Sequence, residues 1–217
     1  MGITERNQKL TEVKKNEIID GMEKALQSKS YDKLTIDDVA KEAEYSKKTV
    51  YSYFKSKDEI YFELLIRKFN LLYDTLQNAI KNSGKRGVEK IMVLGHAYYG
   101  FAKDFPEYMQ AIIDFEAKKS GGDSETDSLI DHFNEETGKS FLLLDEALKE
   151  GIEDKTLIEA TDTDTASTAI LLWASINGFI TLAYKKGEYI ESCYGKSMDA
   201  LFDDCMKFAT RSLRHFQ

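Results

Sequence analysis

The chain has 217 residues, 42% of them hydrophobic, and a formal net charge of −8. This length and hydrophobic content allow a sizeable core, in one large domain or in a small domain joined to a larger one. The first ten residues are polar and charged, which excludes a recognisable signal peptide, and we expect a cytoplasmic protein. Two cysteines, Cys193 and Cys205, form no CxxC motif and are interpreted as structural thiols, so no metal site is indicated.

Charge is distributed unevenly along the chain. Residues 1–58 carry 12 Lys and Arg against 11 Asp and Glu, a net charge of +1, which leaves −9 for residues 59–217. An acidic surface repels phosphates, so the second part is not expected to touch nucleic acid. The chain has one proline and no long Pro/Gly/Ser-rich linker, which favours a continuous helical connection between the two parts.

The first part predicts short helices with one apolar face. Lys14 to Gln27 places Ile18, Met22, Ala25 and Leu26 together. Thr35 and Asp38 then resemble a capping box, the start of a second helix. Apolar residues follow it at helical spacing, namely Ile36, Val39, Ala40 and Ala43.

A third helix is predicted directly afterwards. Ser46 is a good N-cap, and Val50, Tyr51 and Phe54 fall three and four apart, so they can anchor this helix on the previous one. The segment from Tyr45 to Lys57 holds four lysines and no acidic residue. A lysine pair alone usually marks a solvated face. Two short helices joined by a tight turn, with a basic and aromatic second helix, instead favour a helix-turn-helix that reads DNA.

These residues resemble the TetR family of transcription regulators. The family signature, roughly T-x-x-x-[VI]-A-x-x-A-G-V-S-x-G-T-[LV]-Y-x-[YH]-F-x-x-K, is matched at Thr35, Val39, Ala40, Ala43, Ser46, Thr49, Val50, Tyr51, Tyr53, Phe54 and Lys57. The resemblance implies an all-α fold with a helix-turn-helix head at residues 1–58. Residues 59–217 would form a larger helical body that binds an effector and dimerises.

The resemblance also implies roles for individual residues. Major-groove contacts would come from Lys47, Lys48 and Thr49, contacts to the DNA backbone from Thr35, Ser46, Tyr53 and Lys57, and a further hydroxyl contact from Tyr51. Val50 and Phe54 would be core residues. Two positions depart from the pattern, because Glu44 and Lys48 stand where the family usually has glycine. A non-glycine residue at positive φ is strained by roughly 1 kcal/mol or more, so Glu44 is expected to alter the shape of the turn.

The second part predicts further helices. A stripe of apolar residues begins near Ser56 and predicts one long helix that ends within residues 82–87, followed by helices over about 88–104 and 106–116. Residues 118–128 are the most loop-like segment. The next helix, marked by Ile130, Phe133, Phe141, Leu144 and Leu148, should end near Gly151.

Residues 165–184 are 20 consecutive uncharged positions, a length that would suit a membrane span. Six of them are Ser, Thr or Asn, which instead favours a helix buried on one side in its own body and on the other against a partner. A last helix is predicted over about 197–216. The resemblance implies that these two helices pair with their mates in a homodimer through Leu171, Ser175, Gly178, Phe179, Leu182, Leu201, Phe202, Cys205 and Phe208.

Aromatic side chains are frequent in the body and are typical either of plain helical core or of a cavity for an apolar or planar effector. The resemblance implies that a cavity exists, and its candidate contacts are His96, Tyr99, Phe115, Phe133, Trp173 and Asn177. The acidic body favours neutral or cationic effectors over anionic ones.

No enzyme motif of the GxSxG, GxxxxGK[ST], GxGxxG or HExxH type occurs, and the three histidines are scattered, so neither catalysis nor a cofactor is expected. The sequence therefore predicts a ligand-responsive regulator that binds double-stranded operator DNA, most often a repressor in this family. The alternative is an all-helical ligand-binding or scaffold protein whose head has lost DNA binding.

Overall fold

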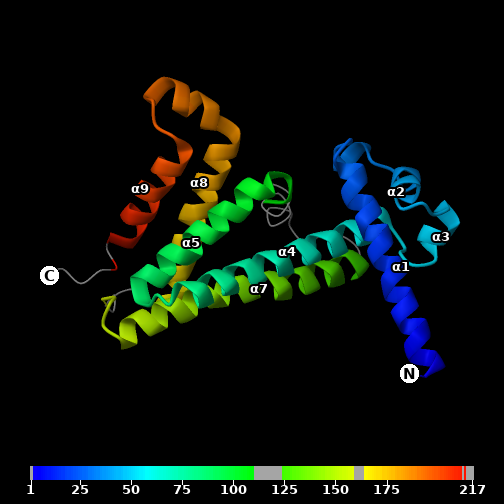
Figure 1. Cartoon of the computed structure of the whole chain (residues 1–217), viewed down its shortest axis with the longest axis horizontal. Helices are drawn as coiled ribbons and strands as arrows, with labels where there is room; N and C mark the ends of the chain where they lie inside the picture. Colours follow the sequence, from blue (N-terminus) through cyan, green and yellow to red (C-terminus); the bar gives the residue numbers. More distant parts are fainter. Residues whose placement is uncertain (1, 110–123, 159–163, 212, 214–217) are drawn as a thin grey trace. The chain divides into compact units, whose positions relative to one another are not determined.

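The computed structural model describes residues 2–109, 124–158, 164–211 and 213, and the regular elements in these ranges are all helices (Figure 1). This confirms the expected all-α fold. The chain divides into two compact units, which are described separately. The head unit is Met1–Lys68 with Gly122–Phe133, and the body unit is Phe69–Gly121 with Asn134–Gln217. The head unit therefore extends past the expected limit at residue 58, by residues 59–68 and by the segment 122–133.

The head unit begins with a helix that is longer than the sequence pattern predicts. Helix α1 spans Ile3–Leu26, whereas the apolar pattern starts only at Lys14. The Glu5 carboxylate accepts a hydrogen bond from the Gly2 backbone N–H at 2.9 Å and so caps the first turn. Its first turns are largely exposed, and for that reason they leave no apolar stripe to detect.

Three further elements complete the helical head: the 3₁₀ helix η1 at Tyr31–Lys33, α2 at Ile36–Glu42 and α3 at Lys47–Tyr51. Helix α2 packs on α1, and α3 packs on α2, with fully buried side chains that include Ile18, Met22, Val39 and Val50. At Gly21 of α1 the two backbones come very close, since a Cβ atom there would lie 2.6 Å from the Ala43 Cβ and 2.9 Å from the Val39 carbonyl oxygen. Only glycine fits this crossing.

Helix α4 spans Lys57–Ser83, as the apolar stripe from Ser56 predicts. The Ser56 hydroxyl accepts a hydrogen bond from the Glu59 backbone N–H at 3.1 Å. Near the end of the head unit, Arg67 pairs with Asp20 and Glu23 of α1 at 2.5 Å each, and Lys68 pairs with Glu23 at 2.6 Å. This cluster fixes the first turns of α4 to α1.

The body unit contains the rest of α4, then α5 at Gly87–Asp104, α8 at Thr165–Tyr194 and α9 at Met198–Arg211. It also contains α7, which spans Ser124–Glu153, from Asn134 onward. The expectation of a loop over 118–128 is wrong for residues 124–128, which form the first turns of α7. Residues 118–123 lie outside the described residues. Of the helix expected over 106–116, residues 106–109 are helical and the remainder is not described.

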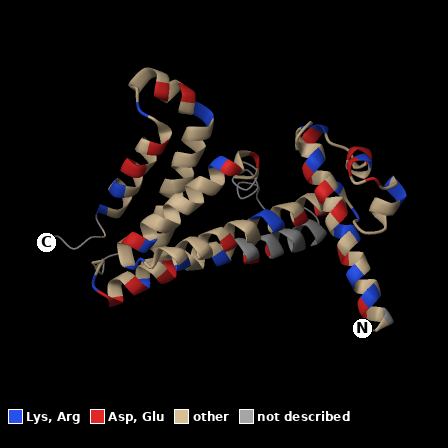
Figure 2. Cartoon of the chain, in the orientation of Figure 1, with Lys and Arg blue, Asp and Glu red and all other residues tan. Residues whose placement is uncertain are grey.

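Helix α8 has two different faces. Ala169, Leu172, Ile176 and Ile180 are buried in the body unit. Figure 2 shows that the first part of the helix carries no charged residue. Large apolar side chains there, Leu171 among them, are exposed. By length and composition, α8 is the one described helix that could cross a membrane, a test that core helices of soluble proteins pass as well.

Candidate nucleic-acid interface and body cavities

The turn between α2 and α3 is regular although it lacks glycine. Glu44 adopts the left-handed conformation with φ of 59°. The Glu44 N–H donates to the Lys41 carbonyl at 3.2 Å and the Tyr45 N–H donates to the Ala40 carbonyl at 2.8 Å. Together these two bonds form the Schellman arrangement that ends many helices. The backbone strain expected at Glu44 is therefore present, while the turn keeps its usual shape.

Both helices of the motif start at a side-chain cap. The Thr35 hydroxyl accepts from the Asp38 N–H at 3.3 Å, and the Asp38 carboxylate accepts from the Thr35 N–H at 3.0 Å. Hydrogen bonds from Lys29 and Thr35 lower the pKa of Asp38 to about 2, so this cap is ionised at neutral pH. The Ser46 hydroxyl accepts from the Thr49 N–H at 3.1 Å.

Helix α3 has one face that is buried in the head and one face that is exposed to solvent, here called its free face. Val50 is fully buried and the following Phe54 is 2% exposed, which confirms both as core residues. Lys48 is exposed, and the Tyr51 side chain is 49% exposed. Thr49 lies at the edge between the faces, half-buried. The exposed face thus carries a cation and a phenol, groups that donate hydrogen bonds to bases or phosphates.

Lys47 stands beside an acidic residue. Its ammonium pairs with the Asp37 carboxylate of α2 at 2.9 Å, and both side chains are more than half exposed. This hydrogen bond raises the pKa of Lys47, so the lysine keeps its charge. Exposed pairs of this kind contribute about 0–1 kcal/mol, so a DNA phosphate or base edge can displace Asp37.

Tyr53 and Lys57 flank the end of the motif. The Lys57 ammonium donates to the Tyr31 and Leu34 carbonyl oxygens at 2.9 and 3.0 Å and lies 4.1 Å from the centre of the Tyr31 ring. It therefore holds η1 against α4, a role that its position in the sequence did not indicate. Tyr53 is half-buried, with the Lys14 ammonium 5.9 Å from its ring centre.

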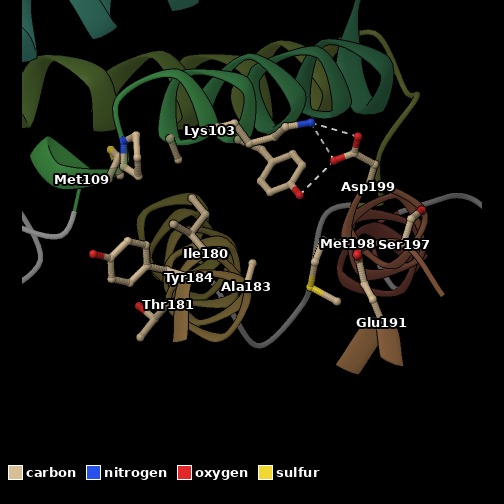
Figure 3. A pocket seen from close by; sticks show the side chains of 13 residues that line it. Lys103, Met109, Ile180, Thr181, Ala183, Tyr184, Glu191, Ser197, Met198 and Asp199 are labelled. Carbon is tan, nitrogen blue, oxygen red and sulfur yellow. Dashed lines mark hydrogen bonds and ion pairs between the residues drawn. The ribbon is translucent and has the colours of Figure 1, made fainter. Parts of the chain in front are cut away.

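The body unit contains a cavity of about 390 Å³ between α5, α8 and the start of α9, here called the α5–α8–α9 cavity (Figure 3). Its apolar lining is Ala102, Pro106, Met109, Ile180, Ala183 and Met198, and its polar lining is Tyr99, Lys103, Thr181, Tyr184, Glu191, Ser197 and Asp199.

The polar groups of this cavity are connected. The Tyr99 hydroxyl donates to the Asp199 carboxylate at 3.0 Å, and the Lys103 ammonium donates to both Asp199 oxygens at 2.8 and 2.9 Å. Lys103 and then Tyr99 lower the pKa of Asp199. Burial and the bond to Asp199 raise the pKa of the Tyr99 phenol, so Tyr99 stays protonated and acts as a donor.

A second cavity of about 250 Å³, the Trp173 cavity, lies between α4, α5, α7 and α8. Its lining is almost entirely apolar and aromatic: Phe69, Tyr98, Gly138, Ser140, Phe141, Ile170 and Trp173. The buried Ser140 hydroxyl oxygen has no hydrogen-bond partner among the described residues, which makes it the polar group available to a ligand there.

The predicted effector contacts are distributed over different places. Tyr99 lines the α5–α8–α9 cavity, and Trp173 lines the Trp173 cavity. Asn177 accepts a hydrogen bond at 3.0 Å from the Tyr98 hydroxyl, and Tyr98 also lines the Trp173 cavity. His96 lines neither cavity. Its imidazole contacts the Asp203 carboxylate and the Met92 carbonyl oxygen at 2.7 Å each, and so links α5 to α9. Phe115 and the side chain of Phe133 lie outside the described residues.

The predicted dimer residues divide between surface and core. Among the residues that the structure describes, twelve large hydrophobic side chains are exposed, and seven of them belong to α8 and α9, so apolar surface concentrates there. Among the predicted residues, Leu171, Ser175, Gly178, Leu182 and Phe208 are exposed, and Phe179, Leu201 and Cys205 are half-buried. The expectation that Phe202 contacts a partner subunit is corrected, because its side chain is fully buried within the body and stacks on Tyr99 with ring centres 4.1 Å apart.

Helix α3 is capped, is anchored by buried side chains and has an exposed basic face, and these features identify the head unit as a DNA-binding helix-turn-helix. Residues 18–64 match the family model of bacterial regulatory proteins, tetR family. By this match the head belongs to the TetR family of bacterial regulatory proteins. No curated protein sequence matches it.

Several solved structures share the fold. The transcriptional regulator FadR from Bacillus subtilis, in complex with stearoyl-CoA, has a TM-score of 0.70 at 19% identity over 90% of this chain and 97% of its own. FadR from Bacillus halodurans, described as a fatty acid degradation regulator, has a TM-score of 0.68 at 21% identity over 92% and 99%. A TetR transcription regulator from Haloarcula marismortui has a TM-score of 0.66 at 18% identity over 94% and 100%. At these identities the likeness shows a common fold.

Proposed function

We propose that this TetR-family regulator is a cytoplasmic homodimer without enzymatic activity that represses transcription and leaves its operator when a small molecule binds the body. In this proposal residues 1–58 bind DNA, and residues 59–217 bind the effector and form the dimer, with the bounds that the sequence predicts. The observation that carries the proposal is the free face of α3, where Lys48 and Tyr51 project from a helix anchored by Val50 and Phe54.

The DNA contacts follow from this face. Lys47, Lys48 and Thr49 would read base edges in the major groove, and Thr35, Ser46, Tyr51 and Tyr53 would contact the DNA backbone. Lys57 would contribute mainly by holding η1 and α4 in place for those contacts. The ion pair between Lys47 and Asp37 would break when the protein binds DNA.

A dimer is needed because one head makes too few contacts for a specific site. The exposed apolar residues Leu171 and Leu182 of α8 and Phe208 of α9 would supply the contact between subunits. Gly178 lies on the same face of α8, and a Cβ built there meets nothing within 4 Å in its own chain, so this position leaves room for a second copy.

Effector control requires only a modest difference in free energy. A small molecule that binds better to a dimer with wrongly spaced heads shifts the population toward it, and a coupling of about 1–3 kcal/mol is sufficient. The body offers two cavities, and the apolar lining of both suits an effector with a large apolar part. A ligand complex of a regulator with the same fold, FadR with stearoyl-CoA, supports this class of control.

Binding to the promoter DNA beside the protein's own gene, measured over a range of salt concentrations, tests the proposal. A regulator should bind tightly and lose affinity steeply as salt rises, because phosphate contacts release counterions. Equal micromolar binding to all sequences would favour a ligand-binding or scaffold protein with a vestigial head. The regular turn at Glu44 argues against such a loss of DNA binding.

A further inference from the structure

The α5–α8–α9 cavity is chemically polarised. Figure 3 shows Lys103, Asp199 and Glu191 where α9 begins, with Met109 and Tyr184 toward the other end. Its volume of about 390 Å³ is in the range of small-molecule sites, about 300–1,000 Å³. A ligand that fills this space would place one polar end against the charged groups and an apolar part against Met109 and Ile180.

The charged groups of the lining do not cancel. Lys103 is the one cation of the lining, and both oxygens of Asp199 already neutralise it, at 2.8 and 2.9 Å. Glu191 remains. One of its oxygens accepts a hydrogen bond from the Met198 backbone N–H at 2.8 Å, which orients the carboxylate without supplying a positive charge. The lining therefore carries a net charge of −1, located at Glu191.

We propose that the α5–α8–α9 cavity binds an organic cation that has an apolar body. The cationic head lies beside the Glu191 carboxylate. The apolar body replaces water against Met109 and Ile180.

An anionic head fits the same cavity poorly. It would meet Glu191 without compensation, and it would have to compete with the Asp199 carboxylate for Lys103, in a pair whose side chains are more than half exposed. Lys103 also lies 5.5 Å from the centre of the Tyr99 ring, a further contact that the anion would disturb. A cation requires neither step, so charge complementarity selects for it.

The inference deepens the proposed function and rests on it for one consequence, the effect on DNA binding. Asp199 belongs to the first turn of α9, and the Met198 backbone N–H is held by Glu191. A cation at Glu191 acts on the segment that connects α8 and α9, the two helices that carry the proposed dimer surface.

Isothermal titration of the full-length protein with three probes of equal chain length tests the inference. The probes are octyltrimethylammonium, 1-octanol and octanoate, which differ in the charge of the head. We expect the cation to bind about tenfold or more tighter than octanoate, with 1-octanol between them. Equal or tighter binding of octanoate would overturn the inference.

A matched pair of variants locates the effect. Glu191→Gln keeps an oxygen that accepts from the Met198 N–H but removes the charge, so the preference for the cation should disappear. Glu188→Gln changes an exposed residue of the same helix that does not line the cavity, and the preference should remain. An unchanged preference in Glu191→Gln, in protein whose circular dichroism shows it folded, would contradict the assignment.

Repeating the titration in the presence of promoter DNA separates this inference from the proposed function. If octyltrimethylammonium binds the cavity but leaves the DNA affinity unchanged, the cation site stands and the effector role fails. If the protein shows no specific DNA binding, the regulator proposal fails, while the preference among the three probes still decides the cation site.

Discussion

The head and the body differ in how far apart along the chain their important contacts are. In the head, the Thr35 cap meets Asp38 three residues later and the Ser46 cap meets Thr49 three residues later. In the body, Tyr99 meets Asp199 at a separation of 100 residues, and His96 meets Asp203 at 107. Short-range contacts are determined by neighbouring residues and so form a motif. Long-range contacts depend on how helices pack, which no local pattern specifies.

The two regions also differ in what a substitution should do. Substitutions in the head should change DNA binding while the dimer stays intact. Substitutions on the α8 and α9 surface should change dimer assembly while the head stays folded.

The largest effect is expected at the proposed dimer surface. The double variant Leu171→Glu and Phe208→Glu places charges at two positions that are 63% and 83% exposed within one chain, so the fold of the subunit should survive. Their burial at an apolar contact should cost about 3 kcal/mol or more, and DNA affinity should fall by about 100-fold or more. Analytical ultracentrifugation at micromolar concentration should show monomers.

Leu142→Glu is the control for this prediction. Leu142 is 56% exposed and belongs to α7, which is not one of the two helices of the proposed dimer surface, so its variant should remain dimeric. A dimeric double variant with unchanged DNA affinity would show that the subunits meet through another surface.

Glycine replacements come next and act on stability. Gly21→Ala should destabilise the head by about 1–3 kcal/mol, because the new methyl group would overlap Ala43 and the Val39 carbonyl oxygen of α2. Gly100→Ala, in a body helix where a Cβ meets nothing within 4 Å, should instead stabilise by about 0.5–1 kcal/mol through helix propensity. Urea unfolding followed by circular dichroism measures both. Equal effects of the two variants would disprove the tight crossing at Gly21.

Substitutions on the helix-turn-helix should separate sequence reading from general affinity. Lys48→Ala should change which base is preferred at one operator position, by about 1–3 kcal/mol. Tyr53→Phe and Lys57→Ala should weaken binding to all sequences alike, the first through a lost contact to the DNA backbone and the second through a loosened η1. Affinities for a panel of operator variants measure both kinds of change. Unchanged profiles for all three variants would show that the groove assignment is wrong.

The smallest effects are expected at two strained positions. Glu44 and Lys155 are the described non-glycine residues with positive φ, 59° in the head and 62° in the body. Replacing either by glycine should relieve strain and stabilise the protein by about 0.5–1 kcal/mol. Glu44→Gly should also tighten DNA binding, since a negative charge beside the phosphates is removed, whereas Lys155→Gly should leave DNA binding unchanged. A fall in DNA affinity for Glu44→Gly would contradict this account.

The sequence predicts the head in detail because its signals are local. The caps at Thr35 and Ser46 and the buried pair Val50 and Phe54 follow from the residues themselves, and the positive φ of Glu44 follows from the family resemblance. The early start of α1 does not follow, because a largely exposed helix has no apolar periodicity to detect.

The sequence predicts the helices of the body but not their contacts. Helical periodicity places Phe202 on the apolar side of α9, yet it does not tell which part of that side packs inward, and Phe202 proves to be fully buried. A histidine among aromatic residues suggests a ligand contact, but the partner of His96 is Asp203, 107 residues away. The charged residues Lys103, Glu191 and Asp199 of the α5–α8–α9 cavity escaped prediction for the same reason.

Selection from a random library of double-stranded DNA with the full-length protein tests the central claim most directly, that α3 reads DNA as one of a symmetric pair. The account predicts an enriched inverted repeat whose half-sites are about 34–36 Å apart, or at a related spacing set by the helical turn. Recovery of no enriched sequence, or of a single half-site without its inverted copy, would contradict it.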